Sequence, residues 1–388
     1  MTSSQSPAIV CLSHLGWDYV WQRPQHILSR LAQHYPVLYV RDPLLNPACD
    51  RGPHLERVAE HGNVTAWQVV YPETPEVMER WRELYVHFLK ELLIQQGWAL
   101  AEGDALASTR PIILWFYTPT PWYVVDHLPA QLVVYDVMDE LANFKGGGQD
   151  LREREQLLLT RCDLVFAGGR SLYEARKQRH AHVHLFPSGV DAQHFAEALH
   201  PATETAPEVA HLPRPVLGYY GVIDERLDLR LIKELAGYRP DWSVVLVGPV
   251  TKLEPEQLPV APNLRYVGQQ PYSRLPRFLK GFDVCLMPFA LNEATRYISP
   301  TKALEYMAAH KPIISTPVPD VVANWAGAVQ IAADIEQFID AANKALDETA
   351  EARAERLSLQ ENLVASHSWD QIASEMGRLI EDALIRRV

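Results

Sequence analysis

The residues of this sequence best suited to chemistry lie between Ser299 and Glu305. Ser299 is of a type favoured at helix N-caps, and Pro300 suits the first turn of a helix. A helix that begins here directs the positive end of its dipole and its free backbone N–H groups, that of Thr301 included, at an anion. Lys302 opposes the dipole unless a phosphate supplies negative charge. The stretch therefore predicts a phosphate site.

Glu305 lies about one turn further along the same expected helix. A carboxylate there can accept hydrogen bonds from the two vicinal hydroxyls of a ribose, as the acidic residue of dinucleotide-binding folds does. One helix would then bind both phosphate and ribose. The alternative is that Ser299 and Pro300 only begin the helix and that Glu305 is a solvated helix residue.

Alternating strand and helix patterns must position these residues. Apolar runs of strand length recur along the chain, separated by amphipathic or turn-forming segments. Parallel strands need crossover helices, so the alternation predicts an α/β fold with open parallel sheets flanked by helices. The expected strands cover residues 8–12, 37–40, 111–116, 131–135, 163–167, 216–220, 243–247, 264–267, 283–287 and 312–315; the expected helices cover 24–34, 151–161, 275–280, 300–309 and 369–387, with others beginning near 171 and 229.

The length of the chain predicts two domains, because 388 residues exceed what one hydrophobic core usually supports. A segment rich in Ala, Pro, Thr and Glu interrupts the alternation before it resumes. We expect an N-terminal Rossmann-like domain over residues 1–200, a linker over 201–214, a C-terminal Rossmann-like domain over 215–367 and a last amphipathic helix within 368–388.

Composition excludes several classes of protein. A net charge of −12 and a pI near 5.7 argue against a nucleic-acid partner, although a local basic patch could still touch a membrane surface. No apolar run reaches the roughly 20 residues of a membrane span, and no export signal is recognised, so we expect a cytoplasmic protein. The cysteines and histidines show no metal-ligand spacing, so no metal is expected. Nothing indicates the oligomeric state.

Three segments resemble, in order, the GT-B glycosyltransferases of the family 4 type. Residues 186–191, Phe-Pro-Ser-Gly-Val-Asp, are similar to the Pro-Asn-Gly-Val-Asp segment of that family, and residues 216–221, Val-Leu-Gly-Tyr-Tyr-Gly, to the opening of its C-terminal domain. Residues 304–314, Leu-Glu-Tyr-Met-Ala-Ala-His-Lys-Pro-Ile-Ile, follow its donor-binding helix, which reads roughly Leu-Glu-Ala-Met-Ala-x-Gly-x-Pro-Val-Ile. The resemblance implies that the sugar nucleotide binds to the C-terminal domain and that the last helix crosses back onto the N-terminal one.

The resemblance also implies an activity. A hexose-type sugar would pass from a nucleoside-diphosphate sugar, with UDP ahead of GDP as the nucleotide, to a hydroxyl of a glycan or lipid-linked glycan in polysaccharide or glycolipid assembly. Enzymes of this family retain the anomeric configuration, and GT-B enzymes work without the metal of GT-A enzymes. No cofactor is therefore expected beyond the donor substrate, and the protein would work at or near the inner face of the membrane.

A basic residue in the loop after the first strand of the C-terminal domain usually meets the diphosphate in this family. Gly221 opens that loop here, and Arg226 is the nearest match. Together with Lys302 it would stabilise the leaving nucleotide. The alternative is that Arg226 forms a surface salt bridge with Asp224 or Asp228.

One departure from the family concerns the sugar half of the site. The E-x7-E pattern of the family places its first glutamate eight residues before Glu305, and Tyr297 stands there in this sequence. Glu293, on the same loop, is the candidate replacement. The chain therefore resembles a divergent subfamily whose donor sugar and stereochemical course the resemblance leaves open.

The loop after the first strand is the expected acceptor site, because ligands bind beyond the carboxyl ends of strands in open α/β sheets. Its tryptophans offer apolar faces to a sugar ring, and its polar side chains offer hydrogen bonds. The candidates are Gly16, Trp17, Trp21, Arg23, Gln25 and His26. The alternative is that the tryptophans hold the loop against the core.

The loop after the strand at 131–135 carries Asp136 and Asp139. In the family the corresponding loop bears the side chain nearest the reacting centre, so either aspartate could orient the acceptor hydroxyl or act as a base. Asp139 could equally cap the next helix. The turn at 168–171, Gly-Gly-Arg-Ser, is only a weak candidate for a phosphate cradle because it lacks the length and ending of a P-loop.

Three other functions remain as alternatives. A nucleotide-sugar epimerase or a phosphorylase can share the fold, but neither the carboxylate set of the first nor the pyridoxal lysine of the second is recognisable. A non-catalytic GT-B scaffold that binds a nucleotide or a partner enzyme is compatible with Tyr297. A NAD-dependent dehydrogenase would need a Gly-x-Gly-x-x-Gly motif after the first strand, which the sequence lacks.

Overall fold

The computed structural model describes residues 5–103 and 105–387. Its first sheet has the strand order β10-β9-β8-β7-β1-β2-β4-β3, and every pairing is parallel except that of β3 with β4. Strands β1, β7, β8 and β9 are buried along their whole length, as expected for a sheet covered on both faces. The strands are β1 (Ala8–Ser13), β2 (Val37–Leu45), β3 (His54–His61), β4 (Val64–Tyr71), β7 (Ile112–Phe116), β8 (Leu132–Val137), β9 (Leu164–Ala167) and β10 (Val183–Leu185).

The second sheet, at the other end of the molecule, is parallel throughout and has the order β13-β12-β11-β14-β15-β16. Both sheets reverse their strand order, the first between β1 and β7 and the second between β11 and β14. Such switch points are where open α/β sheets bind ligands. The strands are β11 (Val216–Tyr220), β12 (Ser243–Val247), β13 (Leu264–Gly268), β14 (Val284–Met287), β15 (Ile313–Ser315) and β16 (Gln330–Ile331).

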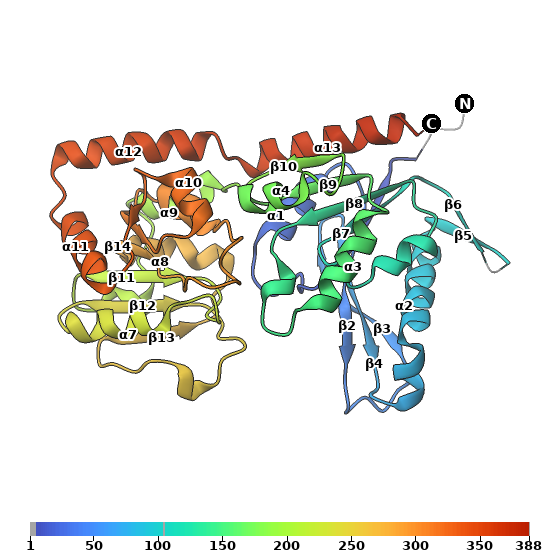
Figure 1. Ribbon diagram of the computed structural model, residues 1–388, viewed down its shortest axis with the longest axis horizontal. Helices are drawn as coiled ribbons and strands as arrows, with labels where there is room; N and C mark the ends of the chain where they lie inside the picture. The colour runs from blue at the N-terminus through green and yellow to red at the C-terminus, as the bar shows by residue number, and fades with distance from the viewer. Residues whose placement is uncertain (1–4, 104, 388) are drawn as a thin grey trace.

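Helices flank both sheets, and a hairpin of β5 (Ala99–Glu102) and β6 (Ala105–Ser108) projects beside the first (Figure 1). Within the described residues, no helix is long and apolar enough to cross a membrane. The helices are α1 (Arg23–Leu31), α2 (Pro75–Gln95), α3 (Gln149–Leu159), α4 (Arg170–Arg176), α5 (Ala192–Ala196), α6 (Pro207–Ala210), α7 (Leu229–Tyr238), α8 (Leu275–Gly281), α9 (Lys302–Ala308), α10 (Pro319–Trp325), α11 (Ile335–Leu346), α12 (Ala350–Ala365) and α13 (Trp369–Ile385).

Helix α13 returns from the C-terminal domain and packs on the N-terminal one, as expected from the resemblance (Figure 1). Its apolar stripe, which includes Trp369, Met376 and Ile380, joins the core that contains Ile27 and Leu28 of α1. A helix with such a stripe must bury it, and α1 supplies the matching face. The expected α/β architecture with two parallel sheets is therefore confirmed.

Two parts of the fold differ from the expectation. Strands β3, β4, β5, β6, β10 and β16 and helices α2, α5, α6, α10, α11 and α12 were not expected. Edge strand β3, for example, is largely solvent-accessible and lacks an apolar run. In addition, Val190, Phe195 and Val209 already belong to the C-terminal core. The chain thus joins that core before residue 200, where the sequence placed the boundary.

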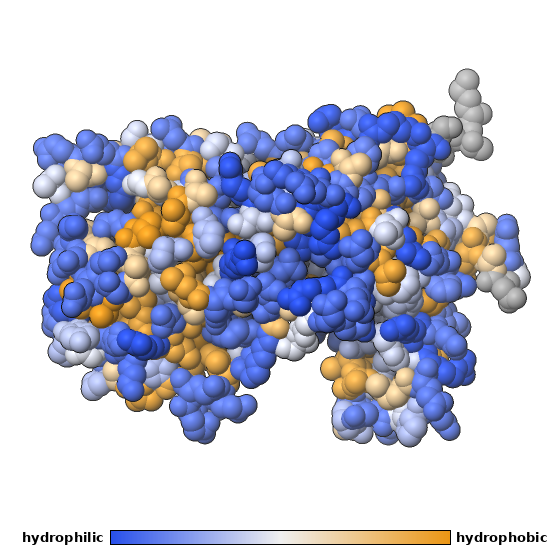
Figure 2. All heavy atoms as spheres, viewed as in Figure 1, coloured by the Kyte–Doolittle hydropathy of each residue, from blue (hydrophilic) through white to orange (hydrophobic). Residues whose placement is uncertain are grey.

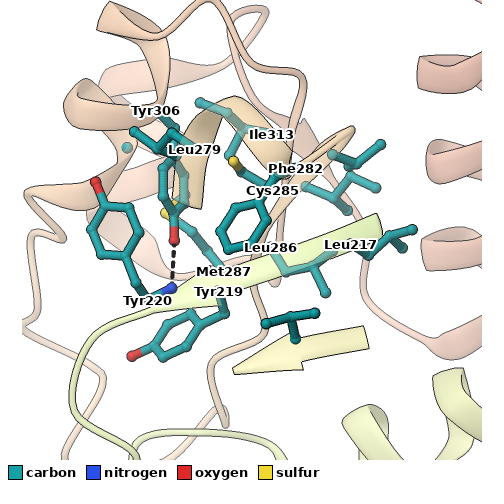
Figure 3. Packing of buried hydrophobic residues seen from close by; sticks show 14 of the residues in the cluster. Leu217, Tyr219, Tyr220, Leu279, Phe282, Cys285, Leu286, Met287, Tyr306 and Ile313 are labelled. Atoms are coloured by element: carbon teal, nitrogen blue, oxygen red, sulfur yellow. Dashed lines mark hydrogen bonds between the residues drawn. The ribbon is translucent and has the colours of Figure 1, made fainter. Parts of the chain in front are cut away.

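Dense packing between β11 and α8 generates a first prediction. A Cβ on Gly218 would lie 2.3 Å from the ring of Phe282, in the core that Figure 3 shows around Leu217, Cys285 and Leu286. We expect Gly218→Ala to lower the free energy of unfolding by about 1–3 kcal/mol, because the ring must move within a close-packed core. Urea denaturation followed by tryptophan fluorescence measures the change.

Gly237→Ala in α7 is the matched control, because no atom lies within 4 Å of the added methyl group. Alanine favours helix over glycine, so this variant should keep or slightly raise the stability of the wild type. Equal destabilisation of both variants would contradict the packing argument.

Candidate functional site

A cavity of about 680 Å³ lies between the carboxyl-end loops of the two sheets. Figure 2 shows the notch between the two lobes on one face of the molecule. The N-terminal domain lines the cavity with residues 17–23, 138–139, Gly168 and Ser188, and the C-terminal domain with 219–222, Arg226, 247–249, 269–272 and 298–302, together with Glu305. The cavity therefore sits at the switch points of both sheets.

Lys302, the first residue of α9, is the cation of this cavity without a charged partner. Its Nζ lies over the rings of Tyr219 and Phe289, 5.4 and 5.3 Å from their centroids, and no carboxylate in the described chain forms an ion pair with it. Gly221 leaves room for the side chain, since a Cβ there would lie 3.0 Å from Lys302 Cε. Burial, followed by the charge of Arg226, lowers the pKa of Lys302 to about 8. An anion entering the cavity would relieve both penalties.

Arg226 lines the same cavity but is held by a neighbouring carboxylate. Its Nε and Nη2 donate to Asp224 Oδ1 and Oδ2 at 2.9 and 2.7 Å, and Phe144 of the N-terminal domain packs 5.5 Å from its guanidinium. The salt bridge with Asp224 that the sequence left as an alternative is thus present. It orients the guanidinium beside Lys302 without removing it from the cavity wall.

Glu305 is a buried wall residue rather than a solvated helix residue, with 7% of its surface exposed. Its Oε2 accepts a hydrogen bond from the Tyr220 hydroxyl at 2.7 Å, whereas Oε1 has no partner among the described residues. Burial raises the pKa of this carboxyl to about 7, against the opposing effects of the Tyr220 hydrogen bond and of Lys302. One oxygen therefore remains available to a ligand.

The start of α9 differs from the expectation. Thr301 is the N-cap and the helix begins at Lys302, because the first turn closes with short-range bonds from Ala303 N to Pro300 O and from Leu304 N to Thr301 O. Ser299 does not cap the helix. Its Oγ is buried and has no hydrogen-bond partner among residues 5–103 and 105–387. A Cβ on Gly169 of the N-terminal domain would lie 3.0 Å from the Ser299 Cβ. Ser299, Pro300 and Thr301 all line the cavity.

Glu293, the proposed replacement for the missing glutamate, lies elsewhere. Its side chain is 75% exposed and stands 3.9 Å from Arg296, outside the cavity. Tyr297 is also outside, partly buried against the N-terminal core. No carboxylate of this loop therefore reaches the cavity, whose lining begins only at Ile298 in this stretch.

Of the two candidate aspartates, only Asp139 faces the cavity. Burial raises the pKa of Asp139 to about 6, although Arg226 opposes this shift. Asp136 is fully buried and forms an ion pair with Arg23, whose Nη2 lies 2.8 Å from Asp136 Oδ1. Its expected role at the reacting centre is therefore not supported by its position, because its carboxylate is used inside the N-terminal domain.

Some of the acceptor candidates line the cavity, and others lie behind the lining residues. Trp17 and Trp21 line the cavity, but Trp17 also packs on Tyr39 at 5.1 Å, so the stapling role left open by the sequence is present too. His26 lies behind the wall, stacked 4.9 Å from Trp369 of α13. The Gly16 carbonyl accepts a bond from Gln25 Nε2, and Arg23 is at the wall but donates to Phe186 O as well as to Asp136.

Sequence reasoning missed several residues of the cavity. Tyr219 and Tyr220 end strand β11, and the rule that ligands bind at carboxyl strand ends would have found them. The turn at 168–171 binds the side chain of Asp320. Ser171 N donates to Asp320 Oδ1 at 3.2 Å, and the Ser171 hydroxyl donates to the same oxygen. The turn is therefore occupied by a carboxylate of the C-terminal domain rather than open to phosphate.

Comparison with known proteins identifies the fold. Residues 214–348 match the sequence model of the family described as Glycosyl transferases group 1. Sucrose-phosphate synthase from Thermosynechococcus elongatus superposes with a TM-score of 0.68 at 16% identity, over 98% of this chain and 100% of that one. The chain has the GT-B glycosyltransferase fold. The resemblance seen in the sequence is confirmed at this level.

Other structures with this fold were solved with ligands. The E. coli trehalose-6-phosphate structure with bound UDP-2-fluoro glucose has a TM-score of 0.67 at 15% identity, over 98% of this chain and 99% of that one. Anabaena Alr3699/HepE in complex with UDP has a TM-score of 0.63 at 13% identity, over 97% and 100% of the two chains. These likenesses describe the fold of this GT-B protein.

A curated relative is a provisionally assigned teichuronic acid biosynthesis glycosyltransferase, TuaH of Bacillus subtilis (strain 168). It is 27% identical to this GT-B chain over 254 residues. The match spans 61% of this chain and 61% of TuaH, less than two thirds of either.

The Arg23–Asp136 pair generates a second prediction. We expect Asp136→Asn to lower the free energy of unfolding by roughly 3–5 kcal/mol, because it leaves the buried Arg23 guanidinium without its counter-charge. Thermal and urea denaturation measure this loss.

Asp370→Asn makes the same chemical change in a pair with Arg30 whose carboxylate is 78% exposed, and it should cost at most about 1 kcal/mol. If the Asp136→Asn protein were as stable as the wild type and had lost only its catalytic activity, the result would support a role for Asp136 at the reacting centre.

Proposed function

We propose that this protein transfers a hexose-type sugar from a nucleoside-diphosphate sugar to a hydroxyl of a glycan acceptor. The observation that carries the proposal is the pair of groups on α9: the unpaired Lys302 cation and the Glu305 carboxylate with a free oxygen, both in the wall of one cavity. A diphosphate needs the first and a ribose the second.

The nucleotide we propose is UDP, ahead of GDP. Two structural neighbours were solved with uridine ligands, one with UDP-2-fluoro glucose and one with UDP. In this chain the diphosphate would lie against Lys302 and Arg226, and their charge would stabilise the departing nucleotide without a metal. The described residues contain no cluster of three or more His, Cys, Asp or Glu side chains placed to hold a metal ion.

Asp139 is the proposed group for the acceptor hydroxyl. It stands in the N-terminal wall of the cavity, and a pKa of about 6 keeps it ionised near neutral pH yet able to accept a proton. A retaining course follows from the family resemblance, although neither Tyr297 nor Glu293 supplies the usual sugar-side carboxylate. Closure of the two domains would exclude water, which competes as acceptor.

The charges of the cavity wall also indicate the kind of acceptor. Among the described residues, the cations of the wall are Arg23, Arg226 and Lys302, and the first two are already paired with aspartates. The N-terminal wall adds two more carboxylates, Asp18 and Asp139. With Lys302 taken by the diphosphate of the donor, an anionic acceptor would meet negative charge without a free cation, so we infer that the terminal sugar of the acceptor is uncharged.

The cellular role we propose is the assembly of a cell-surface polysaccharide or glycolipid. TuaH, the curated relative, is named for the biosynthesis of teichuronic acid. A lipid-linked glycan acceptor would bring this protein to the inner face of a membrane as a peripheral partner.

Nucleotide binding tests the proposal directly. We expect Glu305→Ala and Lys302→Met each to raise the Kd for UDP by about tenfold to a hundredfold, because each removes one charge-assisted contact. Isothermal titration calorimetry measures the Kd, and Glu293→Ala, outside the cavity, should leave it unchanged. Binding of NAD in place of UDP, or a Glu305→Ala protein with wild-type affinity, would contradict the assignment.

Acceptor selectivity tests the inferred charge. With a UDP-hexose donor, we expect kcat/KM for an uncharged alkyl glycoside to exceed that for its 6-phosphate by at least about tenfold, because the phosphate meets unpaired carboxylates. Release of UDP measures the rate, and the 6-O-methyl glycoside controls for bulk at the same position. A preference for the phosphate would show that the acceptor assignment is wrong, and a product epimerised within the donor would favour the epimerase alternative.

A further inference from the structure

A tyrosine at the end of β11 is joined to the carboxylate proposed to bind ribose. Tyr220 is 4% exposed, and its hydroxyl donates to Glu305 Oε2 at 2.7 Å. Both residues line the cavity, although 85 positions separate them in the chain. The contact is therefore a product of the packing of α9 on β11.

The phenol of Tyr220 is fixed on several sides. The ring of Phe195 stacks parallel to it at 6.3 Å, and the ring of Tyr306 meets it edge-on at 5.0 Å. The backbone N–H of Tyr220 donates to the Tyr306 hydroxyl at 3.1 Å, as the dashed line in Figure 3 shows. Because Tyr306 follows Glu305 on α9, two hydrogen bonds tie the strand to the helix, both donated by Tyr220 and accepted by α9.

This arrangement makes the two oxygens of Glu305 unequal. Oε2 is occupied from within the protein, and Oε1 has no hydrogen-bond partner in the described part of the chain. A carboxylate held in this way does not need to reorient when a ligand arrives, which lowers the cost of binding. We propose that Tyr220 is a positioning residue for the nucleotide, holding the Glu305 carboxylate so that Oε1 accepts the ribose hydroxyls. The inference rests on the function proposed above.

The neighbours of Glu305 determine what the loss of the phenol would do. Lys302 faces it from α9 itself, Tyr220 from β11 and Tyr272 from the loop after β13, with Tyr306 next to it in the helix. Beyond Lys302 lie three charged groups that act on that lysine, namely Arg226, Asp224 and Asp139. Burial raises the pKa of the Glu305 carboxyl to about 7, and the Tyr220 hydrogen bond and the Lys302 charge oppose this shift.

The sign of the effect follows from these neighbours. Without the hydroxyl, only Lys302 opposes burial, so the pKa of Glu305 rises above about 7 and the carboxyl is protonated over more of the neutral range. A protonated carboxyl is a weaker acceptor for the ribose hydroxyls. Relative to the wild type, nucleotide binding in the variant should therefore be weakened most near and below pH 7 and approach the wild-type value as the pH increases. Above about pH 8 both proteins should lose affinity together, because Lys302 is deprotonated there.

The experiment compares the wild type with Tyr220→Phe, using UDP-glucose as the probe because its diphosphate does not titrate between about pH 5 and 9. The Kd is measured by calorimetry across that range. In the wild type we expect affinity to fall below about pH 7 as Glu305 is protonated. In Tyr220→Phe the midpoint should move to higher pH, with binding about tenfold weaker at neutral pH and near the wild-type value at the alkaline end.

Two further variants separate positioning from stability. Tyr306→Phe removes the other hydrogen bond between β11 and α9 without touching Glu305, so it should lower the melting temperature but leave the pH midpoint unchanged. Glu305→Gln should abolish the fall in affinity below about pH 7. Adding Tyr220→Phe to Glu305→Gln should cause no further change in the pH dependence of the Kd. If Tyr220→Phe does not fold, 3-fluorotyrosine at position 220, a more acidic donor, should move the midpoint to lower pH.

The outcomes are distinguishable. A wild type that binds no UDP-glucose at any pH would overturn the proposed function itself. A wild type that binds UDP-glucose, together with a Tyr220→Phe protein of the same affinity and midpoint or a fluorotyrosine protein with an unmoved midpoint, would overturn only the role of Tyr220.

Discussion

The relative position of the two domains depends on the place where the chain crosses between them. It crosses near residue 190 and again near residue 368, and the two crossings are bonded to each other by Val190 N and His367 O at 2.8 Å. Trp369, which is 1% exposed, is buried next to the two crossings and stacks on His26. A Cβ on Gly189 would lie 2.9 Å from the Trp369 side chain, so glycine alone fits there. Both sheets consequently present their switch points to one shared cavity.

Several direct contacts hold the two domains together near the cavity. Gln269 Nε2 donates to Tyr19 O, and Asp320 receives the backbone N–H and the hydroxyl of Ser171. Phe144 reaches from the N-terminal domain over Arg226. The first and third contacts join loops of the two domains, and the second joins the start of α4 to α10.

The cavity has a favourable electrostatic environment for an anionic ligand because its charges are unevenly neutralised. Arg23 and Arg226 have carboxylate partners, whereas Lys302 is desolvated over two aromatic rings. Burial raises the pKa values of Asp139 and Glu305 and lowers that of Lys302. All three groups therefore titrate closer to pH 7 than they would in water. Groups shifted in this way mark the sites where a ligand or a reaction can exchange charge with the protein.

The sequence by itself determined the parallel α/β architecture and the placing of Lys302 and Glu305 on one helix. These two features depend on periodicity and on residues close together in the chain, and local patterns report both. The return of the last helix was expected from the family resemblance alone. It did not reveal β3, because an exposed edge strand has no apolar run. Only the tertiary structure decided that Asp136 is used by Arg23, 113 positions away, that Glu293 faces solvent and that Tyr220 holds Glu305. Spacing along a chain does not specify which side chains meet when separate elements pack, and those meetings determine which polar groups remain free for a ligand.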